Sequence, residues 1–456
     1  MWPDEPHAST GLLVDLYHLD AAYVSWRTGQ NAPATFDLYT RAAPFGGAYL
    51  LTAGLEPALA FVRDFHFTDE DLTYLSRIKS YDPAFLDELR CFRFTGEILA
   101  MSEGTVAFAD EPLLQVTAPF REALLLESGL LRAVGVSTLI ATKAARLVDA
   151  AAGRQVADFG FRRAHDPYLA VRAAFVGGCA STSFVAGAKV FGLPAGGTIP
   201  HALVQLFATE EDAFHAVAET LDRYSVLLDT YDVHTAIETA VAVALDAKAR
   251  LGHEMVAVRL DSGDLLADSK HVRRVLDEAG LGETDVLVSG DIDEFRIADL
   301  LRAGAPIAGF GVGGNLAVGL GTAASGTVGG VLGAVYKLVW YEGAGDPARI
   351  KLAGEKSTWP GRKLVYRMGE YEEDVIQLDD EPAPPDGTLL LQPAIHDGAV
   401  LTDLPSVQEI QIRALANVRK LPERYRKLHD PTHYPVRRSA GVLELRERAS
   451  RQQRGV

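Results

Sequence analysis

The sequence predicts an α/β fold that contains a parallel α/β barrel, and three short apolar runs in its second half indicate this. The runs are Met255–Leu260, Val286–Val288 and Ile307–Phe310. Each precedes a polar or glycine turn and a helical pattern, which is the order of a strand–helix unit. Three such units in succession are typical of a parallel barrel, whose active site is built at the carboxyl ends of its strands.

The turns after these runs carry groups that suit a phosphorylated sugar. They are Asp261-Ser262-Gly263-Asp264, Ser289-Gly290-Asp291 and Gly311-Val312-Gly313-Gly314. Carboxylates accept hydrogen bonds from ribose hydroxyls or hold a metal ion, and glycine amides bind phosphate. The turns therefore predict an enzyme that acts on a sugar phosphate.

Length, charge and cysteine content narrow the class of protein. A chain of 456 residues is too long for one ordinary core, so we expect two or three domains. No stretch is apolar enough to span a bilayer, and no secretory signal is evident. The only cysteines, Cys91 and Cys179, favour a reducing cytoplasm over a disulfide framework. A formal net charge of −17 argues against nucleic-acid binding.

Three segments are expected along the chain. Residues 1–130 form an α+β mixture, residues 131–341 alternate strand and helix, and residues 342–456 are a C-terminal segment with a loop at Asp380–Gly387. Helical spacing predicts helices at Asp15–Arg27, Leu55–Phe65, Asp82–Leu89, Ser137–Ala152, Asp166–Phe175 and Thr209–Asp222. Further strands are predicted at Thr35–Thr40, Phe92–Phe94, Thr105–Phe108, Gln155–Phe159, Ser225–Leu228 and Val331–Tyr341.

His201 follows a glycine-rich turn, Ala195-Gly196-Gly197-Thr198-Ile199-Pro200, and precedes an apolar helical pattern. At the carboxyl end of a barrel strand, a neutral imidazole can be a base, a ligand or a phosphoryl acceptor. The alternative is a helix-capping or core histidine.

Other charged and aromatic residues allow two interpretations each. Arg162 follows the strand that ends at Phe159, and it either binds a planar anion or forms a surface salt bridge. Phe159 either stacks on a flat ring or fills the core. Arg259 lies inside a buried-strand pattern, which indicates either a functional site or a structural ion pair. The basic segment Lys356–Lys363 is either a solvated hairpin or a phosphate clamp.

Together these residues resemble the nicotinate phosphoribosyltransferase family, and the likeness extends over most of the chain. The motifs occur in family order: Asp15-Leu16-Tyr17, Pro44-Phe45-Gly46-Gly47, Phe159-Gly160-Phe161-Arg162-Arg163, Thr182-Ser183, Gly197-Thr198 with His201, Asp229-Thr230-Tyr231-Asp232, Asp261-Ser262-Gly263-Asp264, Ser289-Gly290-Asp291, Phe310-Gly311-Val312-Gly313-Gly314 and Pro360-Gly361-Arg362-Lys363.

The resemblance implies a fold and a reaction. The expected fold is an incomplete, TIM-like parallel α/β barrel beside an open-faced α/β sandwich domain formed by the N- and C-terminal segments. The pyridine nitrogen of nicotinate attacks C1 of phosphoribosyl pyrophosphate, giving nicotinate mononucleotide and pyrophosphate in NAD biosynthesis by salvage. ATP is a co-substrate, coupled through a phosphohistidine at the position of His201, and Mg²⁺ is the expected cofactor. The sites are expected to form across a head-to-tail homodimer.

The resemblance also implies roles for single residues. Asp261 and Asp291 assist at the ribosyl centre, Gly313 and Gly314 bind the 5-phosphate, and Arg162 faces an anionic group. Nicotinate is expected to stack between Phe159 and the partner subunit's Tyr17. The remaining expected substrate-binding residues are Thr182, Ser183, Asp229, Arg259, Ser262, Gly263 and Gly290.

Ser183 bears on the choice of substrate. Nicotinamide-using relatives carry an aspartate at the matching position, which accepts from an amide and repels a carboxylate, whereas serine can donate to a carboxylate. Ser183 therefore favours nicotinate over nicotinamide. A quinolinate enzyme would be shorter, and a catalytically inactive binding protein would have lost the acidic turns or His201.

Overall fold

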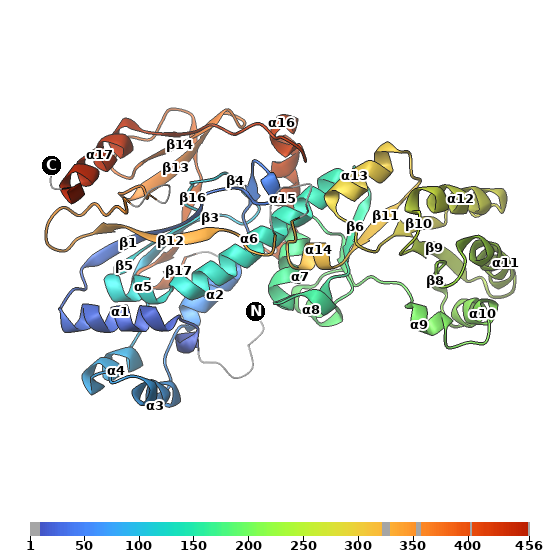
Figure 1. The fold of residues 1–456 in the computed structure, drawn as a ribbon, viewed down its shortest axis with the longest axis horizontal. Helices are drawn as coiled ribbons and strands as arrows, with labels where there is room; N and C mark the ends of the chain where they lie inside the picture. The colour runs from blue at the N-terminus through green and yellow to red at the C-terminus, as the bar shows by residue number, and fades with distance from the viewer. Residues whose placement is uncertain (1–9, 322–328, 353–356, 402–403, 455–456) are drawn as a thin grey trace. The chain divides into compact units, whose positions relative to one another are not determined.

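The computed structural model describes residues 10–321, 329–352, 357–401 and 404–454, and the chain divides into two compact units (Figure 1). The first unit comprises residues 1–142 and 325–456, and the second comprises residues 143–324. The predicted α/β class is confirmed, because the second unit contains a curled, open parallel sheet with helices and the first joins N- and C-terminal segments in one sheet. No helix in the described ranges is long and apolar enough to cross a membrane.

The first unit is built on an antiparallel sheet of six strands. Their order is β12 (Ala334–Tyr341), β1 (Pro33–Thr40), β5 (Leu114–Pro119), β3 (Glu97–Met101), β16 (Leu391–His396) and β17 (Ala399–Val400). A second sheet contains β15 (Gly387–Leu389), β13 (Lys363–Met368), β14 (Glu373–Leu378) and β18 (Val436–Arg438), and a small ladder pairs β2 (Leu50–Leu51) with β4 (Val106–Ala107).

Strand β12 differs from its expected place. The sequence placed Val331–Tyr341 at the end of the barrel segment, but β12 pairs antiparallel with β1, from Ala34↔Tyr341 to Thr40↔Ala334. Phe36 stacks on Tyr336 across this ladder, with ring centroids 4.8 Å apart. An apolar strand of this length fits either sheet, so local pattern alone did not decide its partner.

Further helices complete the first unit. They are α1 (Leu16–Arg27), α2 (Leu55–Asp64), α3 (Asp69–Ile78), α4 (Pro83–Arg90), α5 (Phe120–Leu125), α15 (Val407–Lys420), α16 (Glu423–Arg426) and α17 (Ala440–Arg454), and α6 (Glu127–Ala150) runs through the division between the units. Short 3-10 turns lie at Thr10–Leu12, Pro44–Gly46 and Phe161–Arg163. The helix expected at Ser137–Ala152 thus begins ten residues earlier, at Glu127, and Phe92–Phe94 is not a strand.

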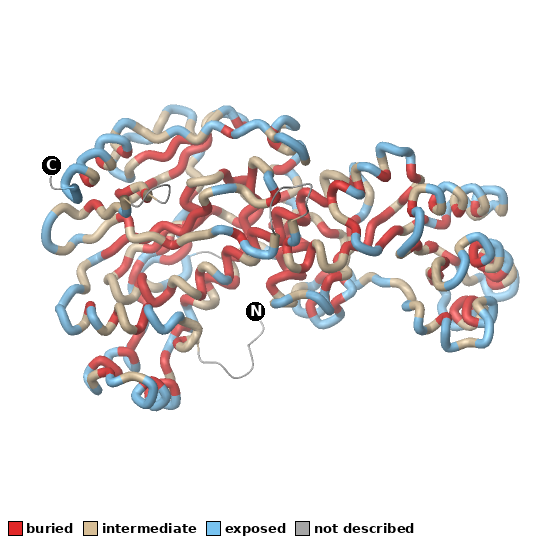
Figure 2. Tube along the Cα trace, viewed as in Figure 1, coloured by how far each residue is buried: buried red, intermediate tan, exposed pale blue. Residues whose placement is uncertain are grey.

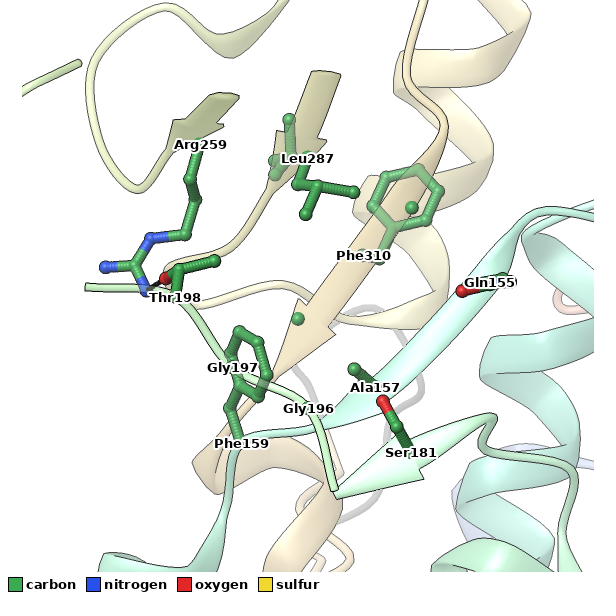
Figure 3. Close-up of a pocket in the computed structure, with 13 residues that line it drawn as sticks. Gln155, Ala157, Phe159, Ser181, Gly196, Gly197, Thr198, Arg259, Leu287 and Phe310 are labelled. Atoms are coloured by element: carbon green, nitrogen blue, oxygen red, sulfur yellow. Dashed lines mark hydrogen bonds between the residues drawn. The ribbon is translucent and has the colours of Figure 1, made fainter. Parts of the chain in front are cut away.

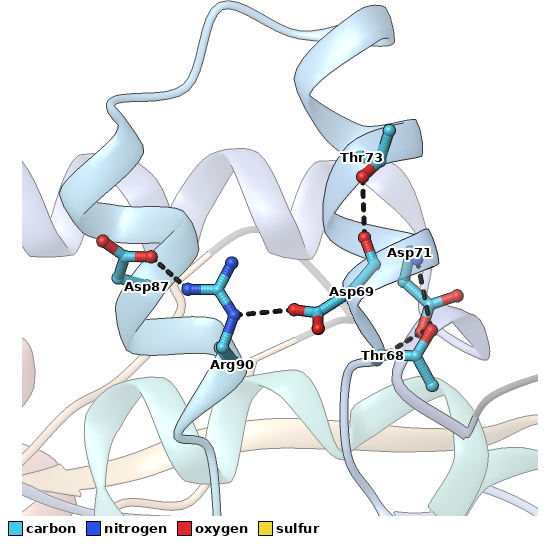
Figure 4. A network of polar contacts seen from close by, with 6 residues as sticks. All are labelled: Thr68, Asp69, Asp71, Thr73, Asp87 and Arg90. Atoms are coloured by element: carbon cyan, nitrogen blue, oxygen red, sulfur yellow. Dashed lines mark hydrogen bonds and ion pairs between the residues drawn. The ribbon is translucent and has the colours of Figure 1, made fainter.

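The helix α3 was not expected from the sequence, although its first turn carries a helix-start pattern. Thr68 and Asp71 form a reciprocal capping box, which satisfies two free amides of the first turn (Figure 4). Arg90 on α4 donates from Nε to Asp69 at 2.8 Å and also bonds Asp87, which links α3 to α4. These groups are exposed, so the ion pairs add little to stability.

The second unit contains a six-stranded sheet in which every pair of neighbours is parallel. The strand order is β7 (Ser181–Thr182), β6 (Gln155–Asp158), β11 (Gly309–Val312), β10 (Asp285–Val288), β9 (Glu254–Leu260) and β8 (Arg223–Leu227). Its helices are α7 (Pro167–Val176), α8 (Val185–Phe191), α9 (His201–Val204), α10 (Glu210–Thr220), α11 (Val233–Leu251), α12 (Leu265–Glu278), α13 (Glu294–Arg302) and α14 (Gly314–Ala317).

The outer helices of this unit are buried along one side and exposed along the other (Figure 2). On α12 the buried residues Leu265, Ser269, Val272 and Leu276 recur at helical spacing, while its other face is exposed. Along each strand, successive side chains point to opposite faces of the sheet, so buried and less buried positions alternate. Val258 and Leu260 of β9 are buried, whereas Arg259 between them is directed to the other face.

A buried group of charges joins α6 to α13. Glu294 accepts hydrogen bonds from Nζ of Lys143 at 2.5 Å and from Nε of Arg146 at 3.0 Å, and the three side chains are at most 1% exposed. Burial opposes ionisation of Glu294, but the two cations outweigh it, so the pKa of its carboxyl is lowered. The group fixes the start of α13, three residues after Asp291.

Candidate active site

Most of the expected site residues lie just beyond the carboxyl ends of the parallel strands. Because all six strands run the same way, the turns that follow them meet at one edge of the sheet. Phe159 and Arg162 follow β6, Thr182 ends β7 and Ser183 follows it, Asp229 follows β8, Asp261, Ser262 and Gly263 follow β9, Gly290 and Asp291 follow β10, and Gly313 and Gly314 follow β11. Tyr17 lies on α1 of the first unit, 61% exposed, with its ring centroid 3.9 Å from that of His18.

Hydrogen bonds tie three successive acidic turns together. Asp229 accepts from the backbone amide of Asp261 at 3.1 Å and from the hydroxyl of Ser262. The hydroxyl of Ser289 in turn donates to Oδ1 of Asp261. The other oxygen of Asp229, Oδ1, is buried without a hydrogen-bond partner in the described part of the chain. Asp261 is therefore held through its backbone amide by Asp229 and through its carboxylate by Ser289.

Gly290 allows this arrangement because no side chain would fit there. Its φ is +80°, and an added Cβ would lie 1.9 Å from the carbonyl oxygen of Asp261. Asp291, with φ of +37°, continues the unusual backbone. The turn after β10 thus needs glycine for two independent reasons, conformation and close approach.

His201 lies next to this acidic group rather than in the core. It is the first residue of α9, and its side chain is 39% exposed. Nδ1 lies 3.2 Å from the hydroxyl of Thr230, and Nε2 lies 3.9 Å from Oδ2 of Asp261. Because Pro200 and not His201 is the N-cap, the helix-capping alternative does not apply. With Nδ1 occupied by Thr230, Nε2 is the nitrogen available for chemistry.

Arg259 is half-buried beside the same aspartate. It donates to the hydroxyl of Thr198 at 2.5 Å, and its Nη2 lies 3.8 Å from Oδ1 of Asp261. Burial lowers the pKa of the guanidinium, although Asp261 and Asp229 oppose this change. Its Nε has no hydrogen-bond partner in the described residues. A poorly solvated guanidinium with a free donor suits an anionic ligand.

A cavity of about 480 Å³ opens among these groups. The three arginines Arg162, Arg163 and Arg259 line it together with Asp261, Ser289, Gly290, Asp291, Gly313 and Gly314. Arg162 and Arg163 are exposed, and no ion pair joins them to a carboxylate within the described ranges. The lining therefore combines cations and bare backbone amides with carboxylates, as a ligand with phosphates and ribose hydroxyls requires.

A smaller cavity of about 190 Å³ lies within the curl of the sheet (Figure 3). Its lining is mostly small or apolar, as at Ala157, Ser181, Gly197 and Leu287, and also includes the polar side chains of Gln155 and Arg259. Phe159, Arg259 and Gly311 belong to the linings of both cavities. The ring of Phe159 is thus a shared wall and not only a core residue, which favours the functional interpretation.

Asp158 organises the turn beside that ring. Its carboxylate accepts from the amide of Gly160 and from the hydroxyl of Thr182, both at 2.8 Å. Burial raises the pKa of Asp158, and these two hydrogen bonds oppose the rise. The hydroxyl of Thr182 is therefore used in a structural hydrogen bond. Ser183 is exposed and comes two residues after Ser181, which lines the smaller cavity. Sequence reasoning missed Asp158, although an acid that ends an apolar strand before a glycine is a usable signal.

Several expected residues lie outside both linings. Gly263 has φ of +79°, which fits its turn, and Ser262, Asp229, Thr182, Ser183 and His201 contact the site only through the neighbours described above. Thr198, Thr230 and Arg163 were not expected as site residues. All three occur in the quoted motifs, so the signal was present in the sequence.

The basic segment at 356–363 is not a free cluster of cations. Lys356 lies outside the described residues. Lys363 is buried and pairs with Asp37 at 2.8 Å, and Arg362 pairs with Asp379 at 2.8 Å. Trp359 receives the guanidinium groups of Arg438 and Arg446 at 4.3 and 3.9 Å from its ring centroid. The described cations of this segment are used in structural contacts, contrary to both interpretations drawn from the sequence.

Comparison with known protein families gives two matches. The N-terminal domain of nicotinate phosphoribosyltransferase (NAPRTase) matches residues 12–135, and the nicotinate phosphoribosyltransferase C-terminal domain matches residues 386–446.

Individual relatives extend the similarity to nearly the whole chain. Nicotinate phosphoribosyltransferase pncB2 of Mycobacterium tuberculosis is 38% identical, covering 93% of this chain and 90% of its own. The Bacillus subtilis nicotinate phosphoribosyltransferase is 37% identical, with 94% and 92% covered. The crystal structure of the human nicotinic acid phosphoribosyltransferase superposes with a TM-score of 0.81 at 29% identity, covering 95% of this chain and 99% of that one.

Proposed function

The chain belongs to the nicotinate phosphoribosyltransferase family of enzymes, and we propose that it couples phosphoribosyl transfer to nicotinate with ATP hydrolysis through His201. An enzyme of this type joins nicotinate to phosphoribosyl pyrophosphate in NAD biosynthesis. The observation that carries the proposal is the cavity of about 480 Å³, where arginines, carboxylates and glycine turns converge at the carboxyl edge of the parallel sheet.

Phosphoribosyl pyrophosphate is assigned to this larger cavity. Arg162, Arg163 and Arg259 neutralise phosphate charge, and the amides of Gly313 and Gly314 bind the 5-phosphate. Asp261 and Asp291 accept from the ribose hydroxyls. Positive charge develops on the ribose ring as the bond to pyrophosphate breaks, and the fixed carboxylate of Asp261 stabilises it without reorganising.

Mg²⁺, when bound, supplies further charge neutralisation for the leaving pyrophosphate. No group of three or more histidine, cysteine or acidic side chains in the described ranges could hold a metal ion by itself. Mg²⁺ usually takes one or two protein carboxylates and completes its shell with water and substrate phosphates. Asp261 and Asp291 fit that pattern, and the unpartnered Oδ1 of Asp229 adds a nearby acceptor.

Nicotinate is assigned to the ring of Phe159, with its carboxylate toward Arg162. Its second stacking partner is the partner subunit's Tyr17, in a head-to-tail homodimer. Exposed apolar side chains on α1 support an interface there, since Leu16, Tyr17 and Val24 are 44%, 61% and 60% exposed. Neither Cys91 nor Cys179 forms a disulfide in the described part of the chain, and this supports the proposal of a reducing cytoplasm.

ATP coupling is assigned to Nε2 of His201. Nδ1 is within hydrogen-bond distance of the Thr230 hydroxyl, and in the tautomer assigned here Nδ1 carries the proton. The lone pair of Nε2 then attacks the γ-phosphorus of ATP and ADP leaves. In the unmodified protein, Nε2 of His201 lies 3.9 Å from Oδ2 of Asp261. A phosphoryl group on Nε2 therefore adds negative charge close to Asp261 and changes the electrostatic potential where pyrophosphate binds. Water then hydrolyses the phosphoramidate and releases phosphate.

Replacing His201 with alanine tests this coupling. We expect ATP to accelerate nicotinate mononucleotide formation by the wild type and not by His201→Ala, because the phosphoryl acceptor is gone. Label from [γ-³²P]ATP should be found on the wild-type chain in an acid-labile form and be absent from the variant. His396→Ala, at an exposed histidine paired with Glu97, is the matched control. ATP stimulation that survives in His201→Ala would refute the coupling.

Replacing Ser183 with aspartate tests the choice of nicotinate over nicotinamide. The new carboxylate repels nicotinate and accepts from an amide, so the ratio of kcat/KM for nicotinate to that for nicotinamide should fall by about tenfold or more, equivalent to about 1.4 kcal/mol. Ser183→Asn has the same shape without the charge and should change the ratio much less. Equal ratios for the aspartate and asparagine variants would show that Ser183 does not contact the carboxylate.

A further inference from the structure

Gly311 lies directly beneath the ring of Phe159. A Cβ added at Gly311 would lie 2.3 Å from Cε2, 2.4 Å from Cδ2 and 3.2 Å from Cζ of that ring. Ordinary contact begins at 3.4 Å, so the ring would have to retreat by about 1 Å to admit a methyl group. The hydrogen of glycine is therefore what lets the ring lie on the strand.

The strand register explains why the two residues meet. The sequence placed Gly311 in a turn, but β11 continues to Val312, with Gly311 paired with Ala157 and Val312 with Asp158. The amide of Phe159 donates to the carbonyl of Val312 at 2.9 Å, so the ladder continues past the end of β6. Phe159 shares a face with Ala157, and its ring leans back over the neighbouring strand at Gly311.

Nothing in the backbone of Gly311 requires glycine. Its φ lies outside the left-handed region, unlike that of Gly290, so alanine would adopt the same conformation. Glycine inside a strand is destabilising relative to alanine, and it marks places where another group approaches the backbone closely. Here the approaching group is the wall shared by both cavities.

We propose that Gly311 is a positioning residue that fixes where the pyridine ring of the substrate lies, by holding Phe159 flat against β11. This inference rests on the proposed stacking of nicotinate on Phe159. A ring displaced toward the cavities would narrow both and move the stacking surface, while the groups assigned to phosphoribosyl pyrophosphate would stay in place.

Gly311→Ala tests the inference through separate Michaelis constants. We expect the KM for nicotinate to rise about tenfold or more and the KM for phosphoribosyl pyrophosphate to change by less than about threefold, because a shift of about 1 Å in a positioning group is costly. A merely structural defect would raise both constants or lower the melting temperature. Equal KM values for nicotinate in variant and wild type would overturn the inference.

A second variant removes the contact from the other side. Phe159→Leu lacks the Cε2 and Cζ atoms that an alanine at 311 would strike, and its shorter, branched side chain can turn its Cδ atoms away. Gly311→Ala should therefore add less than about twofold in the Phe159→Leu background. The double variant also serves if Gly311→Ala alone fails to fold, because the clash is then relieved. Additive effects of the two substitutions would show that the residues act independently and would overturn the inference.

The outcomes separate this inference from the proposed function. If Phe159→Leu raises the KM for nicotinate and Gly311→Ala does not, the stacking role stands and the positioning role fails. If Phe159→Leu leaves that KM unchanged, the stacking role fails and the positioning role with it. Gly309→Ala adds the same methyl two residues earlier, 3.1 Å from Cδ2 of Leu287 and away from Phe159, and should raise the KM much less than Gly311→Ala.

Discussion

Asp261→Asn is expected to lower kcat for nicotinate mononucleotide formation by about 10²–10³, the range found when one preorganised electrostatic group is removed from an active site. Asparagine has the shape of aspartate, and its carbonyl oxygen can still accept from Ser289. The substitution therefore removes the negative charge between Arg259 and His201 and leaves the packing unchanged. The measurement is steady-state kcat with saturating substrates.

Asp285→Asn is the matched control for this prediction. Asp285 is exposed at the amino end of β10, so the same change of charge occurs at the opposite edge of the same sheet. We expect its kcat to stay near that of the wild type. If Asp261→Asn were no slower than Asp285→Asn, the carboxylate of Asp261 would have no electrostatic role in the reaction.

Glu294→Gln is expected to reduce the free energy of unfolding by about 3–5 kcal/mol, because breaking a buried ion pair by removing one partner is strongly destabilising. In this protein two cations, Lys143 and Arg146, would lose their shared carboxylate in a site with no access to water. The start of α13 would lose its anchor to α6. Denaturant titration with a probe in the second unit measures the change.

Glu278→Gln is the control for the loss of stability. Glu278 pairs with Arg274 on the surface of α12, where the side chains are 64% and 58% exposed, and such pairs contribute less than about 1 kcal/mol. A loss in Glu294→Gln as small as that in Glu278→Gln would mean that the buried group does not stabilise the fold.

The strand–helix units were predictable because each combines a buried apolar run with a turn of distinct composition. β9 and β10 appear close to their expected bounds, and α12 follows β9 as the strand–helix pattern predicts. The partner of β12 was not predictable, since pairing between segments about 300 residues apart depends on the whole fold. The helix α6 extends beyond its expected start because tertiary burial, and not local propensity, sustains its first turns.

The sequence predicted which residues belong to the site better than it predicted the contacts between them. The motifs pointed to Asp261, Asp291, His201 and Arg259, and the structure brings the last two within 4 Å of Asp261. The buried carboxylate of Asp158 and the contact of Gly311 with Phe159 depend on strand register, which composition does not reveal. The sequence also placed Gly311 in a turn, so its role on a strand could not be inferred from it.

The most direct test of the account is to supply the wild-type enzyme with phosphoribosyl pyrophosphate, Mg²⁺ and ATP and to compare labelled nicotinate with labelled nicotinamide as acceptors. The account predicts nicotinate mononucleotide with an equal amount of pyrophosphate, and little product from nicotinamide. Preferential turnover of nicotinamide, or no turnover of either acceptor by well-folded protein, would contradict it.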